Sequence, residues 1–296
     1  HGEYGHNVSQ RCVETFPKLL YGKLLLVDQD DSPTVEKMLN ETFWELDRQG
    51  TSPEYYMGGT TATVALRLGE DKLYVANTGD SQTIVVQCTK LGAGRAGGAG
   101  NDRSNNSNNV KAEVIFKSIK DKPTLLEEHD RILRRGGVIG PNGGRVIVHT
   151  KAVRKDIIGL AMSRSIGDWE WGDVGVIPEP RVDVIDLKPY YHHLKSTSNK
   201  SKSKDDTTTS TTTTSLFVMS ASDGIWDRRL RPDFFARQFC STFLGGGDEM
   251  MKSIDGTTTN VKNNVLQRKL MDVIDLVTPT VGYQDDMTAV IMKLDL

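Results

Sequence analysis

The sequence has few cysteines, and their spacing argues against two kinds of chemistry. Cys12, Cys88 and Cys240 form no Cys-x-x-Cys pair, and none is followed six positions later by arginine. We therefore expect neither a metal site of paired cysteines nor the Cys-x5-Arg loop that holds a phosphate against a thiol nucleophile. Isolated cysteines in odd number predict buried, reduced thiols in an intracellular protein.

Long hydrophobic runs and a strong excess of one charge are also missing. No apolar stretch approaches the length of a membrane span, and no cationic start with an apolar core indicates a signal peptide. A formal net charge of −2 provides no basic field for nucleic acid. We expect a globular protein of the cytoplasm or nucleus, with neither nucleic acid nor a membrane as partner.

Helical periodicity of apolar residues predicts five helices. They cover about residues 6–20, 33–46, 125–133, 232–244 and 265–277. Pro17 is expected to disturb the end of the first helix, whereas Pro33 is well placed at the start of the second. His129 is interpreted as a surface or core residue of the third helix rather than as a ligand.

Segments rich in β-branched and aromatic residues predict seven strands. They cover residues 60–68, 72–76, 82–87, 145–149, 182–185, 216–220 and 288–294. Turns that contain glycine separate the first three, so we expect hairpins to connect these strands.

Two stretches are too polar to pack into a core. Residues 92–109 are rich in Gly, Asn and Ser, and residues 195–214 are rich in Ser, Thr, Lys and Asp. Both fall between predicted strands, where a flexible insertion adds only a slowly growing entropic cost. We therefore predict one domain over residues 1–296 with two disordered insertions.

Two acidic turns adjoin predicted strands and carry the main chemical signal. Asp223-Gly224-Ile225-Trp226-Asp227 follows the strand at 216–220, and Gln284-Asp285-Asp286-Met287 precedes the strand at 288–294. If these strands are antiparallel, both turns lie at one edge of the sheet. Carboxylates clustered there would repel one another without a cation, and Mg²⁺ or Mn²⁺ prefers oxygen ligands. The turns therefore predict one metal site.

Five blocks of sequence, taken together and in order, resemble a known family. They are Gly58-Gly59-Thr60-Thr61-Ala62, Asn77-Thr78-Gly79-Asp80-Ser81, Ala161-Met162-Ser163-Arg164-Ser165-Ile166-Gly167-Asp168 and the two acidic turns. In this order, the blocks resemble the metal-dependent protein serine/threonine phosphatases, the PPM or type 2C family.

The resemblance implies an α+β fold, a β-sandwich of two antiparallel sheets flanked by helices. It also implies hydrolysis of phosphoserine and phosphothreonine in proteins by a metal-activated water, with two Mg²⁺ or Mn²⁺ ions. Asp223 and Asp285 would be core metal ligands, and Asp80 with Asp227 matches positions linked to a weaker third ion. Asp80 is nearly as well explained as a turn former, and Asp168 is expected to serve structure. Phosphoproteins are the expected partners of a monomeric protein.

The start of the chain departs from the family. The family's Asp-Gly-His-Gly motif supplies a bridging Asp and a His that protonates the leaving group, and His1-Gly2 matches its second half. We therefore expect a domain truncated before His1, without its first strands, with His1 as catalytic acid of the parent protein. Such a chain should hydrolyse phosphoesters poorly. Lys120-Asp121-Lys122-Pro123 replaces the usual Asp-His-Lys-Pro, which leaves one structural contact open.

Two other functions compete with this hypothesis. The segment Leu24-Leu25-Leu26-Val27-Asp28-Gln29-Asp30 imitates haloacid-dehalogenase-type phosphatases, with Asp28 as nucleophile and Asp30 as acid/base. It leaves the acidic turns unexplained, and Pro33 gives the acidic stretch a simpler role as a helix cap. The other alternative is a catalytically inactive relative that binds phosphoproteins or a regulator, which the missing Asp allows.

Overall fold

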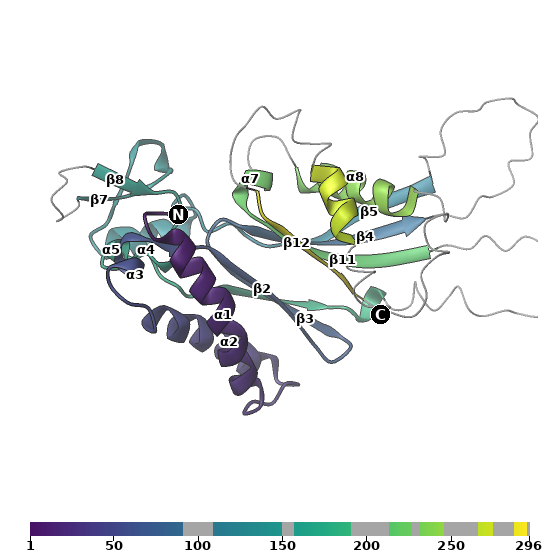
Figure 1. Cartoon of the computed structure of the whole chain (residues 1–296), viewed down its shortest axis with the longest axis horizontal. Helices are drawn as coiled ribbons and strands as arrows, with labels where there is room; N and C mark the ends of the chain where they lie inside the picture. Colours follow the sequence, from purple (N-terminus) through teal and green to yellow (C-terminus); the bar gives the residue numbers. More distant parts are fainter. Residues whose placement is uncertain are drawn as a thin grey trace, which may run out of the picture. The chain divides into compact units, whose positions relative to one another are not determined.

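The computed structural model describes residues 1–90, 109–149, 157–190, 213–226, 231–245, 266–274 and 287–294 (Figure 1). The helices are α1 (Gly5–Leu24), α2 (Ser32–Arg48), α3 (Glu54–Met57), α4 (Leu126–Arg134), the 3-10 turn η2 (Pro141–Gly143), α5 (Trp169–Gly172), α7 (Asp223–Trp226), α8 (Pro232–Gly245) and one over 266–274. The strands are β1 (Gly59–Thr60), β2 (Ala62–Leu68), β3 (Lys72–Thr78), β4 (Gln82–Lys90), β5 (Val110–Lys117), β6 (Val138–Ile139), β7 (Val146–His149), β8 (Ile157–Leu160), β9 (Ile166–Gly167), β10 (Arg181–Asp186), β11 (Thr213–Ala221) and β12 (Ala289–Leu294).

The chain divides into two compact units, each built from two segments of sequence. Unit 1 comprises His1–Gln82 and Ser118–Ile185, and unit 2 comprises Thr83–Lys117 and Asp186–Leu296. The prediction of one domain over the whole chain stays a prediction. The two low-complexity stretches fall largely outside the described residues. Thr213 and Thr214, which the sequence assigned to the second stretch, instead begin β11.

In unit 1, α1 and α2 pack against a sheet of strand order β10-β3-β2 (Figure 1). The predicted apolar stripe of α2 is buried, and it contacts Tyr74 and Ala76 of β3. Pro17 does not end α1, contrary to the prediction, because the helix continues to Leu24. Phe16, Leu19 and Leu20 pack against the core on both sides of the proline, and this burial outweighs its missing hydrogen bond.

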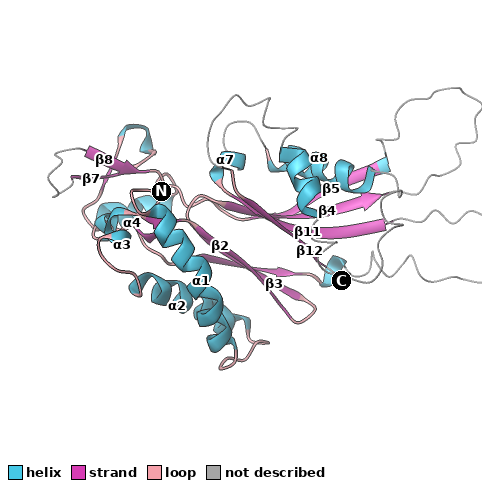
Figure 2. Cartoon of the chain, in the orientation of Figure 1, coloured by secondary structure: helices cyan, strands magenta, loops and turns pink. Residues whose placement is uncertain are grey.

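In unit 2, α8 lies against a sheet of order β12-β11-β4-β5 (Figure 2). β4 is therefore not hairpin-paired with β3 as predicted; only β2 and β3 form that hairpin. In the turn between β3 and β4, the Gly79 carbonyl accepts a hydrogen bond from the Asp121 N–H rather than from a residue of β4. β4 instead pairs with β5, a strand beside the first low-complexity stretch that is not among the predicted ones.

Other predicted elements appear close to their expected bounds. α2, α4, α8, β7, β10, β11 and β12 match, and the antiparallel sheets flanked by helices confirm the predicted α+β class. His129 lies on the surface of α4, with 41% of its side chain exposed. Within the described ranges, no helix has both the length and the apolar character to cross a membrane.

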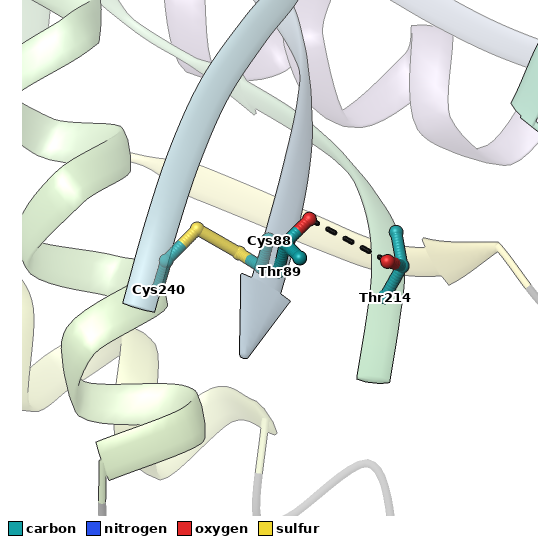
Figure 3. Close-up of a disulfide and its surroundings, with 4 residues drawn as sticks. All are labelled: Cys88, Thr89, Thr214 and Cys240. Atoms are coloured by element: carbon teal, nitrogen blue, oxygen red, sulfur yellow. Dashed lines mark hydrogen bonds between the residues drawn. A yellow bond between two sulfur atoms is a disulfide. The ribbon is translucent and has the colours of Figure 1, made fainter. Parts of the chain in front are cut away.

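The prediction of three reduced thiols is wrong for two of them. Cys88 of β4 and Cys240 of α8 form a disulfide across 152 residues of sequence, with Cα atoms 5.4 Å apart (Figure 3). Both side chains are fully buried in the unit 2 core. Helix-on-sheet packing places them at the separation that a disulfide spans, which sequence spacing does not reveal. Cys12 is free and buried, and burial raises the pKa of its thiol to about 11.

Candidate functional site

The first residue of the chain is held against the Gly58–Gly59 segment by its main chain. The His1 amino group donates to the Gly59 carbonyl at 3.1 Å, and the Gly59 N–H donates to the His1 carbonyl at 3.1 Å. Gly2 and Gly58 add an antiparallel bridge. These contacts fix the point from which the His1 side chain extends.

The His1 imidazole lies against the carboxylate of Asp168. His1 Nε2 and Asp168 Oδ2 are 2.5 Å apart, and the two side chains are 31% and 2% exposed. Asp168 follows β9 and has a left-handed backbone conformation, with φ of 52°. The structure therefore joins the residue predicted as catalytic acid to one that was expected to serve structure.

Two glycines make room for this pair. β1 and β9 are antiparallel, with Gly59 opposite Gly167. A Cβ at Gly59 would lie 2.1 Å from Asp168 Oδ2, and one at Gly167, where φ is +79°, would lie 2.5 Å from the Gly58 carbonyl oxygen. The sequence blocks that contain Gly59 and Gly167 meet here, and these glycines permit the close approach of β1 to β9 and to Asp168.

Asp47 of α2 supports the same segment from the other side. Its Oδ1 accepts the Gly167 N–H at 2.8 Å, and its Oδ2 accepts the Trp169 Nε1–H at 3.1 Å. Burial raises the pKa of Asp47, and these two hydrogen bonds oppose the shift. Sequence reasoning missed Asp47. Its only signal is an acidic residue beside Leu46, on the buried face of an amphipathic helix.

Asp80 lies in the turn after β3 and is nearly buried. Its Oδ2 accepts a hydrogen bond from Lys122 Nζ at 2.6 Å, with side-chain exposures of 4% for Asp80 and 31% for Lys122. The neighbouring Gly79 N–H donates to Asp121 Oδ2 at 3.0 Å. The turn is thus tied to residues 121 and 122, and the Asp80 charge is compensated by a lysine.

A buried ion cluster formed by Asp121, Glu128, Arg131, Arg164 and Arg181 adjoins this turn. Asp121 Oδ1 accepts Arg181 Nε at 2.6 Å. Glu128 Oε1 accepts one Nη2 from Arg164 and one from Arg181, each at 2.7 Å, and its Oε2 accepts Arg131 Nη2 at 2.5 Å. Both carboxylates are fully buried. Asp121 of the altered Lys120–Pro123 motif therefore contacts both the Gly79 turn and Arg181.

Burial acts on both acids of the buried ion cluster but with different outcomes. Burial raises the pKa of Asp121 to about 6, against the attraction of Arg164 and the hydrogen bond from Arg181. Burial also opposes ionisation of Glu128, but hydrogen bonds from Arg131 and Arg164 outweigh it and lower the pKa of Glu128 to about 2. Sequence reasoning missed these residues as a set, because they come from separate segments.

In unit 2, Asp223 is the first residue of α7, just beyond β11. β11 and β12 are antiparallel, as the metal-site hypothesis requires, with Ala221 opposite Ala289. The Ser222 N–H donates to the Thr288 carbonyl at 3.0 Å, and the Thr288 N–H donates to Ser222 Oγ at 3.1 Å. Asp227 and Asp285, the other predicted ligands of these turns, lie outside the described residues.

The described ranges contain no group of three or more His, Cys, Asp or Glu side chains that could hold a metal ion. The haloacid-dehalogenase-type alternative is wrong. Leu24 ends α1, and Leu25 to Val27 form no strand that could place Asp28 at a sheet edge. Asp28 is instead exposed, and its carboxylate accepts the Asp30 N–H at 3.0 Å in a local turn.

Comparison with known proteins defines the family. A family model described as protein phosphatase 2C matches residues 1–229. The chain therefore belongs to the protein phosphatase 2C family, as the five sequence blocks predicted. The structure is also similar to the crystal structure of serine-threonine phosphatase 2C from Toxoplasma gondii, with a TM-score of 0.56 and 13% identity, over 96% of this chain and 81% of that one.

Curated relatives are longer than this chain. It is 28% identical over 236 residues to probable protein phosphatase 2C 64 of Oryza sativa subsp. japonica, covering 77% of this chain and 44% of the relative. It is 27% identical over 233 residues to protein phosphatase 1L of Bos taurus, covering 76% and 49%. The chain spans about half the length of these relatives.

Proposed function

We propose that the protein is a metal-dependent phosphatase that hydrolyses phosphoserine and phosphothreonine in other proteins. Membership of the protein phosphatase 2C family supports this reaction class. The observation that carries the proposal is the pairing of Ser222 with Thr288, because it brings Asp223 and the chain before Thr288 to one edge of the sheet. Asp285 is three residues from Thr288, a span of at most about 11 Å.

Asp223, Asp227 and Asp285 of unit 2 are proposed to hold two Mg²⁺ or Mn²⁺ ions, and Asp80 is proposed as a ligand of a weaker ion. Asp223 fits a hard cation, because it offers carboxylate oxygens in a partly exposed position at the end of a strand. When bound, the ions would supply a water activated for attack near neutral pH and charge that neutralises the phosphoryl oxygens. Asp80 could bind a cation only by sharing or releasing Lys122.

His1 is proposed to act as general acid. As the bond between phosphorus and the substrate oxygen breaks, the imidazole would donate a proton to that serine or threonine oxygen, which is a poor leaving group without one. Its main-chain contacts with Gly59 hold it in place, and its 31% exposed side chain leaves it accessible to a substrate.

The proposal is tested on the full-length protein with a phosphothreonine peptide, with and without Mn²⁺. We expect turnover that requires the metal, and loss of both turnover and Mn²⁺ binding by calorimetry in Asp223→Asn. Asp233→Asn is the matched control, because Asp233 is an exposed acid in the first turn of α8 in the same unit. Mn²⁺ binding that is unchanged in Asp223→Asn would refute the metal assignment. Binding without turnover would favour the catalytically inactive relative.

The third ion has its own test. If Asp80 is a metal ligand, Lys122→Met should free its carboxylate and strengthen the weakest Mn²⁺ site. If Asp80 serves only to hold the turn, Lys122→Met should leave Mn²⁺ binding unchanged and lower the stability of unit 1, because Asp80 would be left buried without its partner.

Phosphoprotein substrates, a monomeric state and a location in the cytoplasm or nucleus are part of the proposal. The Cys88–Cys240 disulfide opposes this location, because disulfides are rare in the reducing cytosol. Cell fractionation combined with thiol trapping of the full-length protein would show whether the protein is cytosolic and whether Cys88 and Cys240 are joined there. A protein found in the cytosol with Cys88 and Cys240 reduced would support the proposed location.

A further inference from the structure

We propose that Asp168 is a positioning residue for His1: it holds the imidazole in the orientation and tautomer needed to protonate the leaving oxygen. The inference rests on the proposed function, in which His1 is the general acid. Asp168 acts only through the ring and contacts neither substrate nor cation in this proposal. The 2.5 Å contact between His1 Nε2 and Asp168 Oδ2 is the observation that carries it.

Hydrogen bonds of Asp168 and of both its neighbours in the chain fix its position. Its own N–H donates to the Gly58 carbonyl at 2.9 Å. The residues on either side, Gly167 and Trp169, both donate to the Asp47 carboxylate. Asp168 also keeps a left-handed backbone that is unfavourable for a residue with a Cβ, and such outliers concentrate at functional sites.

The Gly58–Gly59 segment anchors both partners of the contact. Gly59 exchanges main-chain hydrogen bonds with His1, and its missing Cβ leaves the space that the Asp168 carboxylate fills. The distance between imidazole and carboxylate is therefore set by backbone on both sides rather than by flexible side chains. This is the arrangement that pre-organises a catalytic group.

The contact also determines which nitrogen gives up the proton. An ionised carboxylate can only accept, so Nε2 keeps its hydrogen and donates it to Asp168. The proton transferred to the leaving oxygen therefore comes from Nδ1. The ring begins with a hydrogen on each nitrogen. Water attacks phosphorus, forms the new P–O bond and leaves its hydrogens with the released phosphate, while the ester P–O bond breaks and the serine or threonine oxygen takes the Nδ1 proton. The ring ends neutral, with its remaining hydrogen on Nε2 facing Asp168.

A comparison of two substrates separates this role from a structural one. p-Nitrophenyl phosphate has a leaving group that departs without protonation, whereas the oxygen of a phosphoserine peptide needs a proton. In the full-length protein with Mn²⁺, we expect Asp168→Asn to lower kcat for the phosphoserine peptide by about 10- to 100-fold, a part of the usual contribution of a general acid. For p-nitrophenyl phosphate, kcat should fall by less than about 3-fold.

Two control variants are measured with the same two substrates: Asp173→Asn, close to Asp168 in sequence, and His1→Gln, which removes the imidazole. Asp173→Asn changes an exposed acid just after α5 and should leave both rates unchanged. His1→Gln should show the same split between substrates, and the double variant should be no slower than His1→Gln alone, because Asp168 acts only through the ring. Equal losses on both substrates in Asp168→Asn would show a purely structural role and overturn the proposal, as would no loss on either.

A spectroscopic measurement keeps the proposal testable even if the full-length protein proves inactive. The ring nitrogen shifts of His1, assigned by their loss in His1→Gln, should report a hydrogen on Nε2 and should change in Asp168→Asn but not in Asp173→Asn. Shifts that Asp168→Asn leaves unchanged would overturn the inference. Absence of turnover in the wild type, with these shifts as expected, would count against the proposed function alone.

Discussion

Unit 1 and unit 2 place different chemistry in their interiors. Unit 1 buries the ion cluster, in which Asp121 and Glu128 pair with three arginines, and elsewhere it buries the Asp47 carboxylate. Unit 2 buries a group of aromatic rings, among them Phe217 and Phe239 with centroids 5.0 Å apart, beside the Cys88–Cys240 disulfide. Unit 1 therefore buries charge pairs in addition to its apolar core, whereas apolar side chains and a disulfide form the core of unit 2.

The difference follows from what each unit must position. In unit 1 the candidate groups lie on short turns, where buried carboxylates accept hydrogen bonds from main-chain N–H groups. In unit 2, Asp223 lies two residues after the end of β11, whose apolar side chains are buried with those of α8. Perturbations of charge should thus affect unit 1, and perturbations of the disulfide should affect unit 2.

The largest effect is expected from Glu128→Gln. The change leaves Arg131, Arg164 and Arg181 without the carboxylate that they share, and breaking a buried ion pair in this way costs about 3–5 kcal/mol. Hydrogen exchange followed by mass spectrometry should show protection lost in peptides of unit 1 and retained in unit 2. Loss of protection in both units to the same extent would mean that they unfold together.

Glu127→Gln is the matched control for this variant. Glu127 is the preceding residue, has the same chemistry and pairs with Arg181, but its side chain is 65% exposed. Its removal should therefore cost less than about 1 kcal/mol. An equal loss in the two variants would contradict the argument that burial of Glu128 decides the effect.

The second effect concerns unit 2. Replacing both disulfide cysteines, as Cys88→Ala with Cys240→Ala, should lower the free energy of unfolding by about 2–4 kcal/mol, because the cross-link closes a loop of 152 residues. Dithiothreitol should destabilise the wild type to the same extent and should not affect the double variant. Cys12→Ala serves as control, since this thiol is free and lies in unit 1. A wild type indifferent to reductant would show that the thiols are not joined in solution.

These contrasts also show what the sequence could predict. Long periodic segments such as α2 and the pair β11 and β12 were predicted, because their apolar patterns reflect burial over many residues. The pairing of β4 with β5 was not, because strand partners depend on contacts distant in sequence. For the same reason, local motifs in the sequence signalled His1 and Asp80, whereas the contacts of Asp47 with Gly167 and Trp169 and the Cys88–Cys240 bond join residues distant in sequence and were not predicted.

The third effect is a dependence of unit 1 stability on pH, with opposite signs from two acids. Glu128 has a pKa lowered from 4.5 to about 2, so its contribution is present above pH 4.5 and is lost as pH falls through about 2. Asp121 has a pKa raised from 3.8 to about 6, so its contribution is present below pH 3.8 and is lost as pH rises through about 6. Together they should make unit 1 most stable near pH 4.

Urea denaturation can measure this pH dependence in a Trp226→Phe background, where the three remaining tryptophans all belong to unit 1. We expect the free energy of unfolding to fall by on the order of 2 kcal/mol between pH 4 and pH 7. In Asp121→Asn this fall should become smaller, while the decline below pH 4 stays. A profile that rises between pH 4 and pH 7 in the wild type would contradict the assignment to Asp121.

The smallest effect is expected from a charge pair in unit 2. Lys111 Nζ and Glu113 Oε2 on β5 are 2.8 Å apart, a distance similar to those in the buried ion cluster, but the side chains are 68% and 54% exposed. Water screens this pair, and fixing two long side chains costs entropy, so Lys111→Ala should change stability by less than about 0.5 kcal/mol. Urea denaturation of Lys111→Ala beside Glu128→Gln compares an exposed pair with buried ones. A loss above 1 kcal/mol in Lys111→Ala would indicate that close contact alone, rather than burial, gives ion pairs their strength in this protein.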